Sequence, residues 1–354
     1  MRSLDSPSRL LCAIPIYLLI RDMFASGELK SAIVLNTLAW AASLALLLLP
    51  FFLDDARTLF YGGRIATARV DTNTLGSYLG IFLVIVMFGA WRVLEEMFRN
   101  SPSRARAKSL ALYAVSLAVG FDALLQTQSR GAWIGFTGVF FACVFMMSRL
   151  EYSGRATTAV ILGIICLTGA LFLGDPIYQD RLLSIPIGFF AWLETGQQQD
   201  SGGVRLSMLF ASFSLFIEKP ISGYGEKGYA AALSAPEYLS AYSAATLEAL
   251  AYAGPHNGIL DQALENGMFG LAASLILYLA PIVLLLIGFK KEKRDATVID
   301  ATLKTLGVAF FLQILLLQFT INPYGLRMLA SFNAVMLALF LAFNVSQKTK
   351  SAAS

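Results

Sequence analysis

Charged residues are scarce in this 354-residue chain: Asp, Glu, Lys and Arg make up 14% of it, whereas soluble domains average roughly 25%. Because 57% of the residues are hydrophobic, this scarcity excludes an ordinary soluble domain. The apolar residues form uncharged runs of about 17 to 25, long enough to cross a membrane as helices. The sequence does not show the short segments of alternating apolar and polar residues that are typical of a β-barrel. We therefore predict an all-α, polytopic transmembrane helix bundle with one large, mainly helical loop outside the membrane.

Cysteine and histidine are also rare. The three cysteines are Cys12, Cys143 and Cys166. All lie in apolar segments, which argues against a disulfide framework or a CxxC metal pair. A metal site needs several His, Cys or carboxylate ligands, and His256 is the single histidine, so no metal and no cofactor is expected. The P-loop spacing is missing, and no DxD motif is placed to hold a nucleotide-sugar. The net charge of +4 reports membrane orientation rather than binding to nucleic acid.

The hydrophobic runs divide the chain into three regions. Residues 1–174 are predicted to hold about six N-terminal transmembrane helices, residues 175–257 a large loop outside the membrane, and residues 258–354 three C-terminal helices and a short cytoplasmic tail. The candidate spans are 9–25, 31–53, 74–94, 109–126, 131–148, 156–174, 258–289, 300–320 and 327–346. The first is weak, because Arg21 and Asp22 interrupt it.

Basic segments set the expected orientation. Lys and Arg concentrate in 92–108, 148–155, 290–294 and the C-terminal tail, so these segments are predicted to be cytoplasmic. Residues 54–73, 126–130, 175–257 and 322–327 then face the opposite compartment. Counting backwards places Met1 outside if 9–25 spans, although the basic N-terminus favours the inside. Two explanations stay open: segment 9–25 is re-entrant or interfacial, or the chain has lost upstream helices.

The stretch 175–257 is the one large region without a predicted span. Its many aromatic residues argue for a folded cap rather than disorder. Within it, VRLSMLFASFSLFIEK (204–219) has apolar residues at helical spacing and stops before Pro220. We predict an amphipathic helix that lies on the membrane or over a cavity.

Three basic residues on the predicted outer side are candidates for chemistry. Arg130 could lie at a helix end and extend its side chain to the membrane–water interface, or it could bind an anion such as phosphate. Arg205 follows Gly-Gly and could equally be a surface residue or pair with Asp200. His256 could be a satisfied polar residue or a general base or acid, since imidazole titrates near neutrality. The glycines of EKPISGYGEKGY (218–229) favour a structural turn.

Four segments resemble motifs of the O-antigen ligase and O-antigen polymerase family, in the order that the family has them. PHNGILDQALENGMFGL (255–271) resembles the signature at the end of its large periplasmic loop. The others are QSRGAWIGF (128–136), RLSMLFASFSLFIEKPISGYG (205–225) and GRIATARVDTNTLGSYL (63–79), and together the similarity covers roughly residues 60–345.

The resemblance implies a multi-pass enzyme of the bacterial inner membrane whose active site faces the periplasm. Such enzymes transfer a glycan from an undecaprenyl-diphosphate donor, without a metal, to lipid A-core or to a growing glycan. Arg130 and Arg205 match the family's two essential arginines, and His256 matches its histidine. Asn257, Gln128, Glu265 and Arg64 are predicted to contact substrate, and membrane lipids surround the protein.

The resemblance also leaves alternatives. Ligase and polymerase differ in their acceptor, which the sequence does not identify. A transporter is a third hypothesis, although the central helices are nearly free of ionisable residues and show no internal repeat. The family usually has about twelve spans, of which three follow the loop, so the chain is expected to be shortened at its N-terminus.

Overall fold

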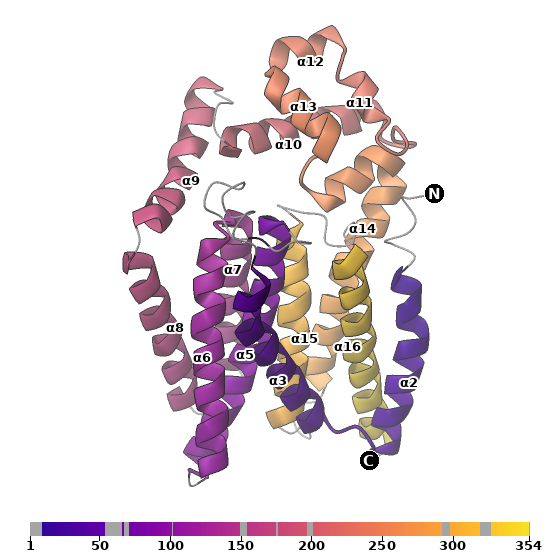
Figure 1. Cartoon of the computed structure of the whole chain (residues 1–354). Coiled ribbons are helices and arrows are strands. Elements are labelled where there is room, and N and C mark those ends of the chain that lie inside the picture. The colour runs from indigo at the N-terminus through magenta and orange to yellow at the C-terminus, as the bar shows by residue number, and fades with distance from the viewer. Residues whose placement is uncertain are drawn as a thin grey trace.

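The computed structural model describes residues 9–53, 66, 71–100, 102–148, 154–174, 176–196, 201–291, 298–318 and 327–353. Long helices stand side by side in a bundle, and shorter helices gather above one end of it (Figure 1). The bundle contains α2 (Ala13–Ser26), α3 (Ser31–Leu48), α5 (Thr72–Arg99), α6 (Arg104–Gln126), α7 (Arg130–Ser148), α8 (Gly154–Gly174), α14 (Gly258–Lys291), α15 (Val298–Leu317) and α16 (Arg327–Ala353). The prediction of an all-α polytopic bundle is confirmed.

Among the described residues, seven helices are long and apolar enough to cross a membrane: Ser31–Phe52, Thr72–Arg99, Arg104–Gln126, Arg130–Ser148, Gly258–Ile287, Ile299–Leu317 and Leu329–Gln347. Each coincides with a predicted span. The apolar part of α8, Gly154–Cys166, is shorter. The first predicted span, 9–25, instead forms the short helix Arg9–Cys12 followed by α2, which has 14 residues and carries Arg21 and Asp22. At about 21 Å, α2 is shorter than the hydrocarbon core.

Helix α5 is the centre of the bundle. It packs against α3, α6, α7, α8 and α15, and most of its residues are buried. Glycines let its neighbours approach closely: a Cβ on Gly89 would lie 2.6 Å from the Ala39 Cβ, and one on Gly80 would lie 2.9 Å from the Gln313 Nε2. Asp71 caps the start of α5, because its side chain accepts hydrogen bonds from the backbone N–H groups of Asn73 and Thr74.

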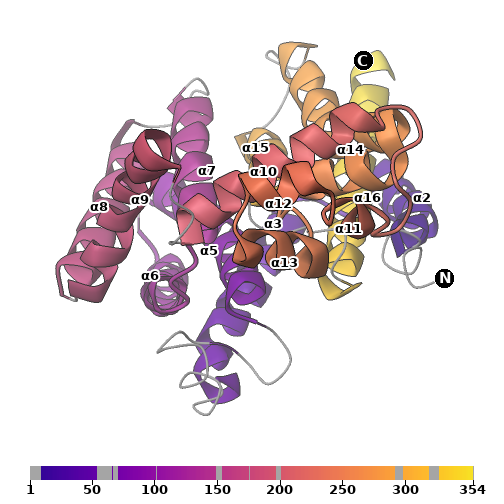
Figure 2. The ribbon, with the colours of Figure 1, turned by 90° about the horizontal axis from the view of Figure 1, so that it is seen from above.

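The cap comprises residues 201–266 and has a hydrophobic core of its own. It consists of α10 (Ser201–Glu218), α11 (Tyr229–Ala232), α12 (Pro236–Ala241), α13 (Ala244–Ala253) and the first turns of α14. Met208, Leu215, Leu250 and Leu264 are among the buried residues of that core. Helix α10 confirms that a helix forms in this predicted stretch, and seen from above it crosses over the end of the bundle (Figure 2). Phe210, on its other face, is 53% exposed.

Helix α9 (Pro176–Thr195) connects the bundle to the cap. It packs against α8 and α10, and it rises from the bundle towards the cap (Figure 1). It lies in the loop that was predicted to be mainly helical, although the only individual helix predicted there was 204–219. The helix forms even though it contains Pro186, a residue that usually breaks or kinks a helix interior.

A kink at Gly267 joins the cap to α14. Gly267 has φ 62° and ψ −149°, so the helical hydrogen bonds are interrupted there. The turn after α10 replaces them. The N–H groups of Tyr224 and Gly225 donate to the carbonyls of Leu264 and Glu265 at 2.8 and 2.9 Å. In the other direction, the Met268 N–H donates to the Pro220 carbonyl at 2.6 Å. The glycines at 223, 225 and 267 are therefore structural, as predicted for the turn.

Two tyrosines of the cap core carry raised pKa values. Burial raises the pKa of the Tyr229 phenol, and the carboxylates of Asp261 and Glu265 raise it further. Burial also raises the pKa of Tyr238, whose hydroxyl donates to the carboxylate of Glu218. Both phenols therefore stay protonated to a higher pH than an exposed tyrosine does.

Two neighbouring glycines test the junction. Gly223 and Gly225 both have positive φ, so alanine at either position should cost about 1 to 2 kcal/mol of backbone strain. A Cβ on Gly223 would also lie 2.6 Å from the Glu265 carbonyl and the Gly267 nitrogen, whereas one on Gly225 meets nothing within 4 Å. We expect Gly223→Ala to lower the melting temperature of the purified protein clearly more than Gly225→Ala does. Equal losses would contradict the junction.

The raised pKa values of the two tyrosines predict that the folded cap becomes less stable at alkaline pH. An unfolded tyrosine loses its proton near pH 10 while the folded one keeps it, so the unfolded state gains stability as pH rises above about 10. The loss should approach about 1.4 kcal/mol per pH unit for each buried phenol. Limited proteolysis of the cap across this range should show a shallower pH dependence for Tyr229→Phe than for wild type. The control is Tyr252→Phe, because that side chain is 86% exposed, and it should follow wild type.

Candidate active site

Arg130 is the first residue of α7, at the end of the bundle below the cap. The turn before it is held locally, because the Thr127 hydroxyl donates to the Leu124 carbonyl at 2.7 Å and accepts from the Ser129 N–H. The guanidinium is half-buried, and its Nη2 donates to the Ser184 hydroxyl of α9 at 2.5 Å. Gln128 lies in the same turn, half-buried, with a left-handed backbone at φ 49°. The turn thus presents a fixed cation towards α9.

Arg205 is the fifth residue of α10 and is half-buried. Two residues on, the Ser207 hydroxyl accepts a hydrogen bond from the Trp192 indole N–H of α9 at 3.0 Å. The Trp192 ring also stacks on Phe210, with 5.1 Å between the ring centroids. Helix α9 therefore contacts both arginine-bearing helices. Its two contact residues, Ser184 and Trp192, are eight positions apart, which is about 12 Å along a helix.

His256 lies between α13 and α14 in a strained turn. Gly254 ends α13 with φ 77°, Pro255 follows, and His256 itself is left-handed at φ 51°. Its side chain is half-buried. Asn257 caps α14: its Oδ1 accepts hydrogen bonds from the N–H groups of Ile259 and Leu260, at 3.1 and 3.0 Å. The amide oxygen of Asn257 is thus used by the helix, and contact of Asn257 with substrate stays a prediction.

Asp261 and Glu265 lie one turn apart on α14 and tie it to the turn before α11. The Tyr229 hydroxyl donates to Asp261 Oδ1 at 3.5 Å, and the Lys227 N–H donates to Glu265 Oε1 at 3.2 Å. The Lys227 ammonium in turn donates to the Tyr252 carbonyl at 2.8 Å. One oxygen of Glu265 therefore orders the cap, and its predicted contact with substrate is not tested by this arrangement. Arg64 lies outside the described residues.

Backbone strain marks two of the predicted residues. Within the described residues, the non-glycine positions with positive φ are Gln128, Lys227 and His256. Such a conformation costs on the order of 1 to 3 kcal/mol and is found most often at functional sites. Motif reasoning missed Lys227, although it follows a Gly-x-Gly turn. Ser184 and Trp192 were missed as well, because their contacts with Arg130 and Ser207 join different helices.

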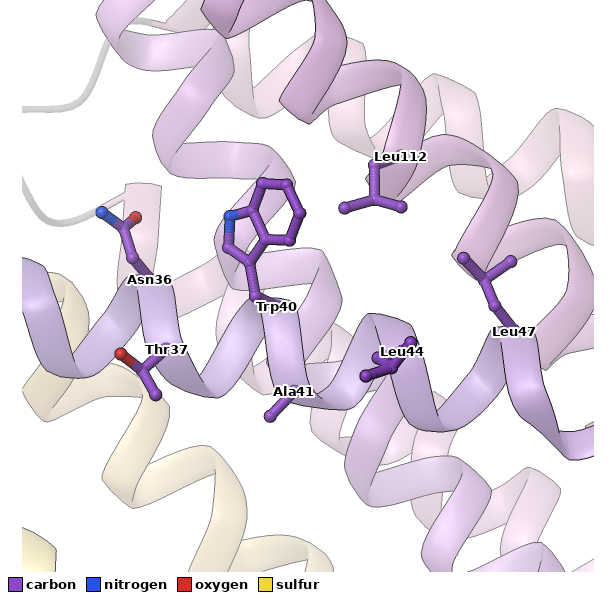
Figure 3. A pocket seen from close by; sticks show the side chains of 7 residues that line it. All are labelled: Asn36, Thr37, Trp40, Ala41, Leu44, Leu47 and Leu112. Atoms are coloured by element: carbon purple, nitrogen blue, oxygen red, sulfur yellow. The ribbon is translucent and has the colours of Figure 1, made fainter.

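Two grooves open on the bundle. One, of about 290 Å³, lies between α6, α7 and α8, and its lining includes Trp133, one turn below Arg130. The other, of about 590 Å³, runs along α3 and includes Leu112 of α6 (Figure 3). Its polar residues, Asn36 and Thr37, lie at one end, with Trp40 beside them. None of the predicted active-site residues that the structure describes lines this second groove.

Across the described ranges, no three His, Cys, Asp or Glu side chains gather as the ligands of an ion would. The titratable groups around α14 instead bond to the cap: Asp261 with Tyr229, and Glu265 with the Lys227 backbone. The arrangement offers a cation held by Ser184 on α7, a second cation on α10 and an imidazole just before α14.

Comparison with known proteins finds a match to one family model and one similar protein. A family model described as O-antigen ligase matches residues 115–275, from the second half of α6 to the part of α14 beyond its kink. The matched stretch contains Arg130, Arg205 and His256. An uncharacterized protein of Haemophilus influenzae is 23% identical over 284 residues, which are 80% of this chain. The chain spans 66% of that protein's length, slightly under two thirds.

The family match agrees with the motifs and with the helical architecture. It includes the helices that carry both arginines and the turn that carries the histidine. This chain is a multi-pass membrane protein whose residues 115–275 match the family model described as O-antigen ligase.

Proposed function

We propose that the chain is a metal-independent glycosyltransferase of the O-antigen ligase type. It moves a glycan from an undecaprenyl-diphosphate donor to a sugar hydroxyl of lipid A-core. One observation carries the proposal: within the family match, Arg130, Arg205 and His256 all lie on elements at the cap end of the bundle (Figure 1), and α9 contacts both arginine-bearing helices.

The two arginines suit a lipid-diphosphate leaving group. As the bond between the sugar and the diphosphate breaks, negative charge grows on the departing oxygen and must be stabilised. A guanidinium carries a permanent charge and a planar fork of donors that fits phosphate oxygens. Arg130 is held by Ser184 before substrate arrives, so little reorganisation is needed when the charge develops.

His256 suits the acceptor. A sugar hydroxyl attacks more readily when a base removes its proton during bond formation, and an imidazole can do this near neutral pH. The strained backbone at His256, between the Gly254 cap and the Asn257 cap, fixes where the side chain emerges. We therefore assign His256 as the base and the arginines as the charge clamp.

The basic segments support a periplasmic position for the cap. The segment 92–108 connects α5 to α6 at the end of the bundle away from the cap, and the Lys-containing C-terminus of α16 lies at that end too (Figure 1). Lys and Arg near spanning helices favour the cytoplasm. In the inner membrane, the cap and the three proposed residues would then face the periplasm, where the lipid-linked donor and lipid A-core meet.

Complementation tests the proposal. In a strain that lacks its own ligase, the chain should restore long-chain lipopolysaccharide on electrophoresis. Arg130→Ala, Arg205→Ala and His256→Ala should each reduce the product by about 10²-fold or more, as expected for loss of charge stabilisation or of a general base. Arg104→Ala, an exposed arginine at the other end of the bundle, should leave the product unchanged.

The intermediate that accumulates distinguishes two activities. A ligase defect leaves undecaprenyl-linked polymer, whereas a polymerase defect leaves single repeat units. Accumulation of single repeats in the His256→Ala strain would replace ligase by polymerase. Full product from all three variants, at normal protein levels, would overturn the site assignment.

Ser184 is a positioning residue for Arg130. Ser184→Ala keeps the guanidinium but removes a hydrogen bond to a charged group, a contribution of about 1.5 to 3 kcal/mol. We expect the KM for the donor to rise by about tenfold or more, with a smaller effect on kcat than that of Arg130→Ala. Ser148→Ala, at the other end of α7, is the matched control, because the Ser148 hydroxyl bonds only locally to Phe145. An unchanged KM for Ser184→Ala would contradict this role.

A further inference from the structure

The turn that carries His256 is strained and closely packed. Its backbone takes a positive φ twice, 77° at Gly254 and 51° at His256. Gly254 and Pro255 are buried, whereas the His256 side chain is half-buried. A left-handed backbone at a non-glycine residue costs free energy and persists only where the surrounding contacts maintain it. The neighbours of this turn therefore decide where the imidazole lies.

One set of contacts lies against Gly254. Asp261, in the first turn of α14, approaches so closely that a Cβ on Gly254 would lie 3.1 Å from its Oδ1. The same Cβ would lie 3.3 Å from the hydroxyl of Tyr229, which donates to that carboxylate oxygen. Tyr229 is itself fully buried in the cap core. The backbone at Gly254 thus rests on a carboxylate that a buried tyrosine anchors.

A second contact comes from Lys227. Its ammonium donates to the Tyr252 carbonyl, in the last turn of α13, at 2.8 Å. Carbonyls at a helix C-terminus lack partners within the helix, and a cation there also interacts favourably with the helix dipole. The Lys227 N–H donates to Glu265, one turn after Asp261. Lys227 therefore ties the end of α13 to the start of α14, and His256 lies between these two helices.

The backbone of Lys227 is strained as well. Its φ of 53° is left-handed, a region that glycine and asparagine enter more easily than lysine does. Strain of this kind is found where several contacts fix a residue together, most often at functional sites. In the cap, one strained residue contacts the turn that contains another. The segment 227–229 and the first turns of α14 thus hold the turn of His256 at two points.

We propose that Asp261 and Lys227 are positioning residues for His256. Asp261 holds the turn at Gly254 and Lys227 holds it at Tyr252, so that the imidazole emerges in one direction. The inference rests on the proposed function and deepens it, because a base works only when its nitrogen lies within hydrogen-bond reach of the hydroxyl. A displacement of about 1 Å can lower a rate by about 10²-fold.

The single histidine makes this positioning measurable. Protein labelled with ¹³C-histidine gives one imidazole signal in NMR spectra of the full chain in lipid nanodiscs, because His256 is the one histidine of the sequence. Wild type should give a single narrow signal. Asp261→Asn and Lys227→Met nearly keep the size of the side chain, so both should fold, but each removes a charge that holds the turn. In both variants the signal should shift, and it should broaden or split.

Two exposed residues of the cap supply matched controls. Glu248→Gln, on α13, removes a carboxylate, and Lys219→Met removes an ammonium that lies over the Tyr224 ring rather than on the turn of His256. Both controls should keep the imidazole signal of wild type. Lys227→Arg retains a cation that can donate to the Tyr252 carbonyl, and its signal should stay close to that of wild type.

Kinetics of ligation give a second measurement. Asp261→Asn and Lys227→Met should each lower kcat by between about tenfold and 10²-fold, because the base is displaced. The KM for the donor should stay within about twofold of wild type, since Arg130 and Arg205 are unchanged. Lys227→Arg should recover most of kcat. A loss of fold would not produce this pattern, because it would reduce the amount of active enzyme in every variant that melts earlier.

Three results would overturn the assignment. If Asp261→Asn and Lys227→Met keep the imidazole signal of wild type, these residues do not position His256. If the controls change the signal equally, the effect belongs to the charge of the cap as a whole. If the KM for the donor rises as much as kcat falls, the residues bind substrate instead. Failure of the proposed function is separate: the expected signals without any restored lipopolysaccharide would leave the positioning role assigned and remove the transferase.

Discussion

The backbone junction at Gly267 is the constraint on which the arrangement of the cap depends. A helix that leaves the membrane and turns loses hydrogen bonds at the turn, and buried unpaired backbone groups are costly. Here the carbonyls of Leu264 and Glu265 receive the amides of Tyr224 and Gly225, and the amide of Met268 reaches Pro220. The kink therefore exists only where the turn after α10 lies against it. Spanning helix and cap are built as one unit.

This junction fixes the orientation of two elements of the proposed site. Helix α10 ends just before Pro220, so its far end, with Arg205, is set by the angle at which α10 leaves the junction. The first turns of α14 run back from Gly267 to Asn257, which places His256 at the opposite end of a rigid arm of about 14 Å. The shared core, to which Met208 of α10 and Leu264 of α14 both belong, holds the two helices together. The glycines of the junction thus help to set the positions of Arg205 and His256, although neither residue lies at the junction.

The sequence predicted the parts of the structure that depend on local pattern. Long apolar runs identified the spans, and the Gly-Tyr-Gly turn was correctly interpreted as structural because glycine supplies positive φ. Asn257 could have been recognised as a helix cap, since asparagine before a helix is a common one. The contact from Ser184 to Arg130 could not, because it joins residues 54 positions apart. Helix α9 was missed for a related reason: its contacts with α7 and α10 hold a segment in which Pro186 argues locally against a helix.

Helix α9 also links the groove to the cap. Near the start of α9, Tyr178 contacts Trp133, which lines the groove between α6, α7 and α8. In the middle of α9, Ser184 accepts a hydrogen bond from Arg130. Near its end, Trp192 donates to Ser207, two residues from Arg205. A ligand that displaced Trp133 or drew Arg130 away from Ser184 would therefore act on the same helix that supports α10. Since packed helices shift as units, the lipid-facing groove and the second arginine are mechanically connected through α9.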